Sequence, residues 1–294
     1  MSVPVRAPSI RGRAAAVVGA VLALVLTGCG NLPPTSAPAP VPVPGQAPGT
    51  VVAPAGADVP TVVRQVQDAI TAGGGVVVTT VDHTATARAV GVQLPPTTEV
   101  IGGPAAAGLP LLRVSQVAGA NLPQHYLVRQ GADGAVTVTA NSAEYVAAVS
   151  GVTPDAARTA LHDATAAVLN AVAPGSGSTL GSPLVGITPT DYLITLPSAA
   201  AVPATVDRLR RGADRAPTRS VGLVDLATPP ADGGPPLRPT TLVLVTLPDA
   251  EAALVAAAPT FGIDLPMRFL VWADEQNRTQ VGYPTSAGSR CATA

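Results

Sequence analysis

The stretch LPPTTEV, at residues 94–100, recurs as LRPTTLV at residues 237–243, with five of the seven residues identical. The same offset of 143 residues aligns Leu122-Pro123 with Leu265-Pro266, and no gap is needed between the two matches. One offset shared by separate segments is typical of an internal duplication. The sequence therefore predicts two copies of one small domain.

The length and composition of the chain fit this organisation. Its 294 residues, 47% hydrophobic and 12% charged, are enough for two ordinary cores. We place the first repeat at residues 50–174 and a second, degenerate repeat at residues 185–290. A Gly- and Ser-rich linker at residues 175–184 joins them, and residues 291–294 form a tail. If the repeats are autonomous domains, little of either core should cross this linker; a single joint core is the alternative.

Each repeat is predicted to have the order β-α-β-β-α-β-β. Apolar residues about four apart indicate the first helix, and the nearly all-apolar run at residues 241–245 indicates a buried strand. Turn residues such as Asp133-Gly134 indicate a closing hairpin. Asp58 and Ser198 are the expected N-caps of the two first helices, and Thr153 that of a further helix in the first repeat. The predicted fold class is α+β, with helices packed on one antiparallel sheet in each repeat.

The N-terminus has the features of a bacterial lipoprotein signal peptide. Three arginines precede an apolar run at residues 14–26 that is too short to span a bilayer. The run ends in LTGC, at residues 26–29, which resembles the lipobox whose cysteine is acylated before cleavage on its amino side. We therefore expect residues 1–28 to be removed and Cys29 to carry the lipid, which would anchor the chain to membrane lipid on the outer face of the cell membrane.

The segment after the expected anchor is rich in proline. Residues 31–49, NLPPTSAPAPVPVPGQAPG, contain seven prolines and favour an extended polyproline II spacer. We interpret residues 29–49 as a lipidated cysteine followed by a stalk. The other cysteine, Cys291, lies in the tail; because Cys29 is expected to be consumed by lipid, Cys291 is expected to be an exposed thiol, with intermolecular pairing as the alternative.

The first repeat contains a series of short motifs: Val81-Asp82-His83, Ala87, Gly91, Leu94-Pro95-Pro96-Thr97, Ile101-Gly102-Gly103-Pro104 and Leu122-Pro123. Together these motifs resemble the domain-of-unknown-function 302 family. The second repeat resembles the closing segment of the family in residues 264–272, DLPMRFLVW. The resemblance implies a compact α+β domain related in shape to the TATA-binding-protein-like group, with no established activity.

Candidate ligand-binding residues follow from these motifs, in the first repeat alone. Asp82 beside His83 at the end of a strand is a pair that could orient an imidazole as a base or ligand, although a surface turn is the plainer interpretation of His83. The segment Gly102, Gly103 and Pro104 is the candidate binding loop, where the family usually has Gly-Asn-Pro. The second repeat has Leu226 in place of His83 and Val245-Thr246-Leu247 in place of the loop, so a shared site would survive in the first repeat at best.

Other chemistry receives little support from the sequence. The formal charge of −1 offers no basic field for nucleic acid. There is no phosphate-binding loop, no zinc-type Cys/His spacing and no nucleophile elbow, so no catalytic residue, metal or cofactor is predicted. His125, aligned with Arg268, and His162 are both expected to be exposed.

Two classes of function therefore remain open. The favoured hypothesis is a lipid-anchored envelope lipoprotein that is not an enzyme and binds a small apolar ligand, a lipid or a protein partner. The alternative is an enzyme or a metal- or haem-handling domain that uses Asp82 and His83 of the first repeat.

Overall fold

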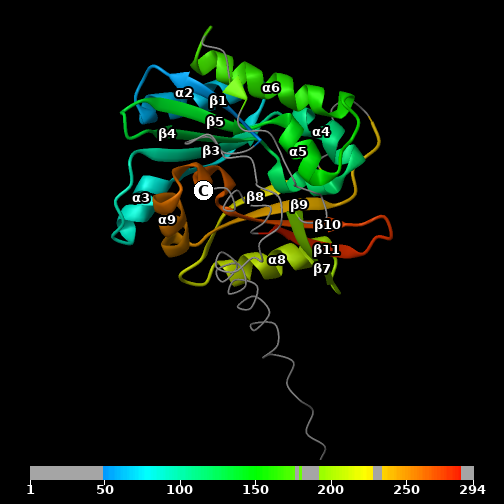
Figure 1. The fold of residues 1–294 in the computed structure, drawn as a ribbon. Coiled ribbons are helices and arrows are strands. Elements are labelled where there is room, and N and C mark those ends of the chain that lie inside the picture. The colour runs from blue at the N-terminus through cyan, green and yellow to red at the C-terminus, as the bar shows by residue number, and fades with distance from the viewer. Residues whose placement is uncertain (1–48, 176–178, 181–191, 228–233, 286–294) are drawn as a thin grey trace, which may run out of the picture. The chain divides into compact units, whose positions relative to one another are not determined.

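The computed structural model describes residues 49–175, 179–180, 192–227 and 234–285. These residues form two antiparallel sheets with helices, an α+β fold in two tandem repeats (Figure 1). The sheet of the first repeat has the order β2-β3-β4-β5-β1-β6, and that of the second has the order β7-β11-β10-β9-β8. Within the described residues, no helix is both long and apolar enough to pass through a membrane.

The first repeat contains the predicted elements and two helices that the sequence did not indicate, α3 and α5. Residues 179–180 of the expected linker form a short strand, β6, which pairs with β1. In chain order the elements are β1 (Thr50–Ala55), α2 (Val59–Ala72), β2 (Val76–Asp82), α3 (His83–Ala89), β3 (Thr97–Gly103), α4 (Ala105–Val114), the 3-10 helix η2 (Gln116–Asn121), β4 (His125–Gln130), β5 (Val136–Asn141), α5 (Ala143–Ser150), α6 (Ala156–Val172) and β6 (Thr179–Leu180).

The second repeat has the predicted order β-α-β-β-α-β-β, with a 3-10 helix before its closing hairpin. Its elements are β7 (Leu193–Ser198), α8 (Val202–Ala213), β8 (Arg219–Asp225), β9 (Thr240–Thr246), α9 (Pro248–Ala257), the 3-10 helix η3 (Pro259–Asp264), β10 (Met267–Ala273) and β11 (Thr279–Pro284). The offset of 143 residues relates β1 to β7, β3 to β9, α4 to α9 and η2 to η3 residue for residue. Even the irregularity in strand pairing at Val77/Thr79 recurs at Ser220/Gly222. The duplication therefore extends to the backbone.

The first helices of the two repeats begin differently. In α2 the Asp58 carboxylate accepts a hydrogen bond from the Thr61 amide at 3.0 Å, as predicted. In α8 the N-cap is Ala201 rather than the predicted Ser198, which ends β7 instead. The Ser198 hydroxyl contacts the Thr205 hydroxyl at 2.8 Å, so it still links the strand to the first turn of the helix. Helix α6 likewise begins after Asp155 rather than Thr153.

One hydrophobic cluster belongs to the first repeat alone. Helices α2 and α6 cover one face of its sheet and bury residues such as Val66, Ile70, Tyr126 and Val168 against it. Apolar residues spaced three or four apart on α2 produce this face, because that spacing aligns them along one side of a helix.

A second hydrophobic cluster is built by both repeats. Leu111, Tyr145 and Val149 of the first repeat pack in the same buried group as Leu244 and Trp272 of the second. The described contacts also make one compact unit rather than two. Of the two arrangements that the sequence leaves open, these contacts favour the joint core, because the two repeats share this buried cluster.

The two 3-10 helices explain how the interior is shared. A Cβ placed on Gly119 of η2 would lie 2.7 Å from Leu226 and 2.9 Å from Leu270, both in the second repeat. A Cβ placed on the equivalent Gly262 of η3 would lie 2.8 Å from Leu127 of the first repeat. Each 3-10 helix thus packs on the other repeat, and glycine at both positions lets the helix approach leucine side chains of that repeat closely.

Candidate functional site

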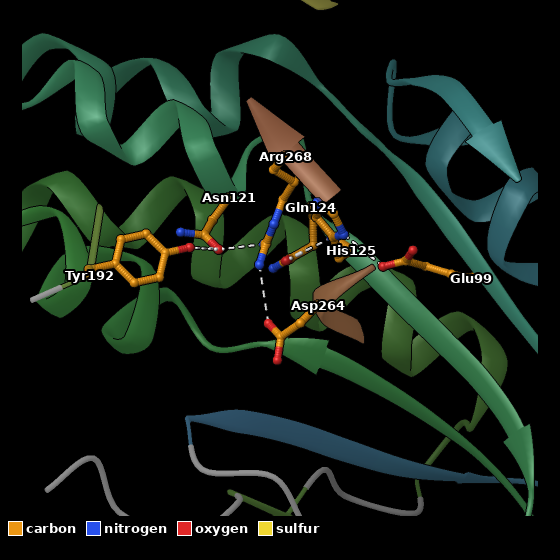
Figure 2. A network of polar contacts seen from close by, with 7 residues as sticks. All are labelled: Glu99, Asn121, Gln124, His125, Tyr192, Asp264 and Arg268. Carbon is orange, nitrogen blue, oxygen red and sulfur yellow. Dashed lines mark hydrogen bonds and ion pairs between the residues drawn. The ribbon is translucent and has the colours of Figure 1, made fainter. Parts of the chain in front are cut away.

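Polar side chains gather where the two repeats meet. We call this group the inter-repeat polar cluster (Figure 2). None of its members is among the residues that the sequence put forward as a site, and every one is at most 6% exposed. Its members are Glu99, Asn121, Gln124, His125, Tyr192, Asp264 and Arg268.

The cluster contains an acid–imidazole pair on neighbouring strands. Glu99 lies within β3 and His125 begins β4, and the two strands are paired. Glu99 Oε1 is 2.7 Å from His125 Nδ1, and both side chains are fully buried. An antiparallel pair of strands places neighbouring residues of one face close together, which brings the carboxyl group to the imidazole.

Arg268 binds residues from both repeats. Its Nη1 donates to the Asn121 Oδ1 at 2.8 Å, and its Nη2 donates to the Asp264 Oδ1 at 3.2 Å. The Tyr192 hydroxyl also donates to Asn121 Oδ1, at 3.0 Å. Asn121 ends η2 and Asp264 ends η3, so the two acceptors of Arg268 occupy equivalent positions in the two repeats. Figure 2 shows the guanidinium between these two side chains.

Gln124 ties the cluster to the rest of the first repeat. Its Nε2 donates to the Asn141 carbonyl at the end of β5 and to the Thr165 hydroxyl on α6, both at 2.8 Å. Its Oε1 accepts a hydrogen bond from the His125 amide at 3.0 Å. A buried amide with all of these bonds fixes the positions of a strand end and a helix.

Burial controls the electrostatics of the cluster. Desolvation raises the pKa of Glu99 well above its usual range, and the charge of Arg268 opposes this only in part. Burial alone would lower the pKa of Arg268, but Tyr192 and Asp264 more than compensate and raise it, so the guanidinium keeps its charge. Desolvation also raises the pKa of Glu251, whose carboxylate accepts hydrogen bonds from Thr246 and the Leu247 amide near the start of α9.

The geometry of the cluster determines what it can do. A carboxyl group with a raised pKa beside an imidazole is a combination found in acid–base catalysis. Here, however, the pair is fully buried, and the other polar groups bond to one another across the two repeats. Among the described residues, Glu99 Oε2, Asn121 Nδ2 and Arg268 Nε are buried without a hydrogen-bond partner. The bonds that are made join the two repeats, so the cluster helps to specify how the repeats fit together.

Asp82 and His83, predicted as a ligand-binding pair, have separate structural roles. The Asp82 carboxylate caps α3 by accepting from the Ala85 amide at 2.9 Å. His83 was expected on a surface turn, but it is 2% exposed and lies beside Gly262 of η3. Burial lowers the pKa of His83 to about 4, against the opposing effects of the Gly262 backbone and Asp82. Thus His83 is a neutral core residue that contacts the second repeat.

The predicted binding loop is the end of a strand. Gly102 and Gly103 are the last residues of β3 and pair with Val77 and Val76 of β2, while Pro104 precedes α4. A Cβ on Gly102 would lie 2.6 Å from the Val76 carbonyl oxygen. Glycine is needed here for the close approach of two strands, and no ligand is required to explain it.

The other predictions for basic residues have mixed outcomes. His162 is exposed, as predicted, and its Nδ1 lies 4.0 Å from Glu144. The expectation that His125 and Arg268 occupy a solvated position is wrong, since both are buried. The alignment of these two residues was nevertheless informative, because a polar residue retained at the start of both closing hairpins forms the centre of the cluster.

One sequence signal could have revealed the cluster. Glu99 interrupts a run that is otherwise apolar or threonine, and its equivalent in the second repeat is Leu242. A carboxyl group in a buried strand requires a partner, and His125 starts the next strand. Within the described ranges no group of three His, Cys, Asp or Glu side chains is arranged to hold a metal ion. Cys29 and Cys291 lie outside those ranges.

Comparisons with known proteins agree with the duplication. The family model "Domain of unknown function DUF302" matches residues 50–172 and 194–289, which together make more than half of the chain. No curated protein matches the chain in sequence. Among solved structures, the chain is similar to "uncharacterized conserved protein DUF302 from Bacillus stearothermophilus", with 11% identity and a TM-score of 0.37, over 42% of this chain and 95% of that one. The protein therefore belongs to the DUF302 family, of which it contains two tandem copies.

Proposed function

We propose that this protein is a lipid-anchored lipoprotein of the cell envelope, which binds a partner and catalyses no reaction on it. Support for the anchor comes from the basic and apolar segments before LTGC at residues 26–29, and from the proline-rich stalk that follows. Such an anchor would hold the two repeats close to the outer face of the cell membrane.

The observation that supports the binding role is that the titratable side chains considered above have structural roles. Glu99 and His125 bond to each other in the interior, Asp82 caps a helix, and His83 is packed against the second repeat. An active site needs such groups within reach of a substrate. Here they stabilise the fold, which favours a binding module over an enzyme or a metal- or haem-handling domain.

The surface favours a partner that binds at an open face of the protein rather than in an enclosed pocket. A hollow lined by Pro54, Ala55, Gly56 and residues 172–174 is mostly apolar and widely open. Enclosed pockets bury most of a small ligand, whereas an open apolar hollow suits the side chain of a protein or an acyl chain of a lipid. We therefore place a lipid or protein partner ahead of an enclosed small molecule.

The anchor is tested by replacing its cysteine. Cells that express the wild-type chain, Cys29→Ser or the control Cys291→Ser are labelled with a radioactive fatty acid and fractionated. We expect label in the wild-type chain and in Cys291→Ser, both in the membrane fraction, and none in Cys29→Ser. Label that persists in Cys29→Ser would refute the proposed anchor.

The binding role is tested on the acylated chain extracted from membranes. Its absorbance spectrum, metal content and native mass are recorded for the wild type and for His83→Leu. We expect neither haem nor metal in stoichiometric amount, and co-purified mass that consists of lipid or protein. A stoichiometric haem or metal that is lost in His83→Leu would instead establish the alternative.

A further inference from the structure

Helix α8, the turn after it and the first residue of β8 carry a concentrated set of arginines. Five of the seventeen cationic residues of the chain lie between residues 208 and 219, and all five are exposed. We call this set the arginine surface. Its members are Arg208, Arg210, Arg211, Arg215 and Arg219.

The charge of this surface is not neutralised by nearby acids. In the part of the chain that the structure describes, none of the five arginines forms an ion pair with a carboxylate. Arg208 instead donates to the Ser198 hydroxyl at 3.2 Å. Two aspartates lie in the same stretch, Asp207 and Asp214, and Asp214 accepts a hydrogen bond from the Ser220 amide. A net positive charge therefore remains on this segment.

The first repeat shows that the fold does not require these arginines. Helix α2 occupies the equivalent position and has similar packing against its sheet. The residues of the first repeat at the five positions are Gln65, Gln67, Asp68, Ala72 and Val76. Helix α8 packs on β8, β9 and β10 (Figure 1), and its three arginines are exposed.

We propose that the arginine surface docks the second repeat on anionic phospholipid headgroups. The partner is a flat anionic surface rather than a polyanion that wraps around the chain, because five exposed arginines lie within residues 208–219 while the net charge of the whole chain is only −1. This inference rests on the proposed lipid anchor for its location: a stalk at residues 29–49 would keep the arginine surface at high local concentration near the membrane. Each arginine that reaches the headgroups contributes about a fivefold gain in partitioning.

The test uses the mature chain with Cys29→Ser, so that binding does not depend on acylation. Flotation with vesicles of phosphatidylcholine alone and of an equimolar mixture with phosphatidylglycerol measures partitioning. The chain is expected to float with the mixed vesicles alone, and salt should weaken the binding. The double variant R210E/R211E should lose at least about twenty-fivefold in partitioning. The control R64E/R88E reverses two exposed charges on the first repeat and should bind like its parent.

Each result decides the matter. Absence of binding to the mixed vesicles, or equal losses in the two double variants, would overturn the proposal. Capture of a soluble nucleic acid by the arginine surface without vesicle binding would overturn it as well. Thermal melting of both variants verifies that they are folded. Failure here would leave the acyl labelling of Cys29 unaffected, so the anchor and the docking surface are tested separately.

Discussion

Arg268 of the second repeat donates a 2.8 Å hydrogen bond to Asn121 of the first, and both side chains are buried. The same guanidinium donates to Asp264, which is the equivalent of Asn121 in its own repeat. One side chain is thus held by the end of both 3-10 helices, each of which packs on the opposite repeat. The two repeats are therefore joined through the inter-repeat polar cluster.

Removal of the Asn121 acceptor should destabilise the whole chain. In Asn121→Ala, the buried Arg268 and Tyr192 both lose an acceptor, at an expected cost of about 2–4 kcal/mol. Asn121→Asp keeps the oxygen, and Asp occupies the equivalent position of the second repeat, so its loss should be clearly smaller. Urea unfolding measures both. Equal stability of Asn121→Ala and the wild type would show that the contact is dispensable.

Glu99 should make the stability depend on pH. Its pKa is raised in the folded chain, so folding favours the protonated form. Stability is therefore fully present below the unfolded-state pKa and declines as the pH rises from there toward the folded-state pKa, by up to about 1.4 kcal/mol per pH unit. Glu99→Gln should flatten this decline, and the exposed Glu144→Gln should retain it. Identical pH profiles for the wild type and Glu99→Gln would contradict the assignment.

His83 should contribute in the opposite direction. Its folded-state pKa is about 4, below the ordinary 6.5, so the unfolded chain binds a proton first as the pH falls. Stability should be lost between pH 6.5 and about 4. His83→Leu, which installs the residue found at position 226, should reduce this loss, whereas His83→Ala should cost about 2–5 kcal/mol. An exposed His83 would give nearly unchanged stability in both variants, as the exposed control His162→Leu should.

Gly102→Ala distinguishes a strand contact from a binding loop. The new Cβ would lie 2.6 Å from a backbone oxygen of β2, which cannot rotate away, so a loss of about 1–3 kcal/mol is expected. Gly56→Ala is the matched control, because its Cβ would meet nothing within 4 Å. Thermal melting compares the two. A stable Gly102→Ala would restore the binding-loop hypothesis.

Local patterns predicted much of the fold. The 143-residue offset, the apolar spacing of α2 and the cap at Asp58 depend on residues close in sequence, and the structure confirms them. The predicted start of α8 was wrong by a few residues, because Ser198 remains in β7 and the helix begins after Ala201 without a side-chain cap. The residue at which a helix begins depends on where the preceding strand ends, and the periodicity of apolar residues does not fix that position.

The polar cluster could not be predicted in the same way. His83 is buried beside Gly262 and Arg268 is buried beside Asn121, and both of these neighbours are far away along the chain. Sequence alone treats a histidine or an arginine beside a turn as solvated, because that is their usual environment. These residues can be placed in the interior only once it is known that each 3-10 helix packs on the other repeat.

The central claim is that the two repeats unfold as one unit, and Trp272 provides the most direct measurement. It is the only tryptophan of the chain and lies in the second repeat, at 7% exposure. Ile70→Ala opens a cavity in the cluster that belongs to the first repeat alone, at an expected cost of about 2–5 kcal/mol. In urea, we predict that Trp272 fluorescence and far-ultraviolet circular dichroism shift together to a lower midpoint in this variant. A Trp272 transition that stays in place while part of the dichroism signal unfolds earlier would contradict the shared core.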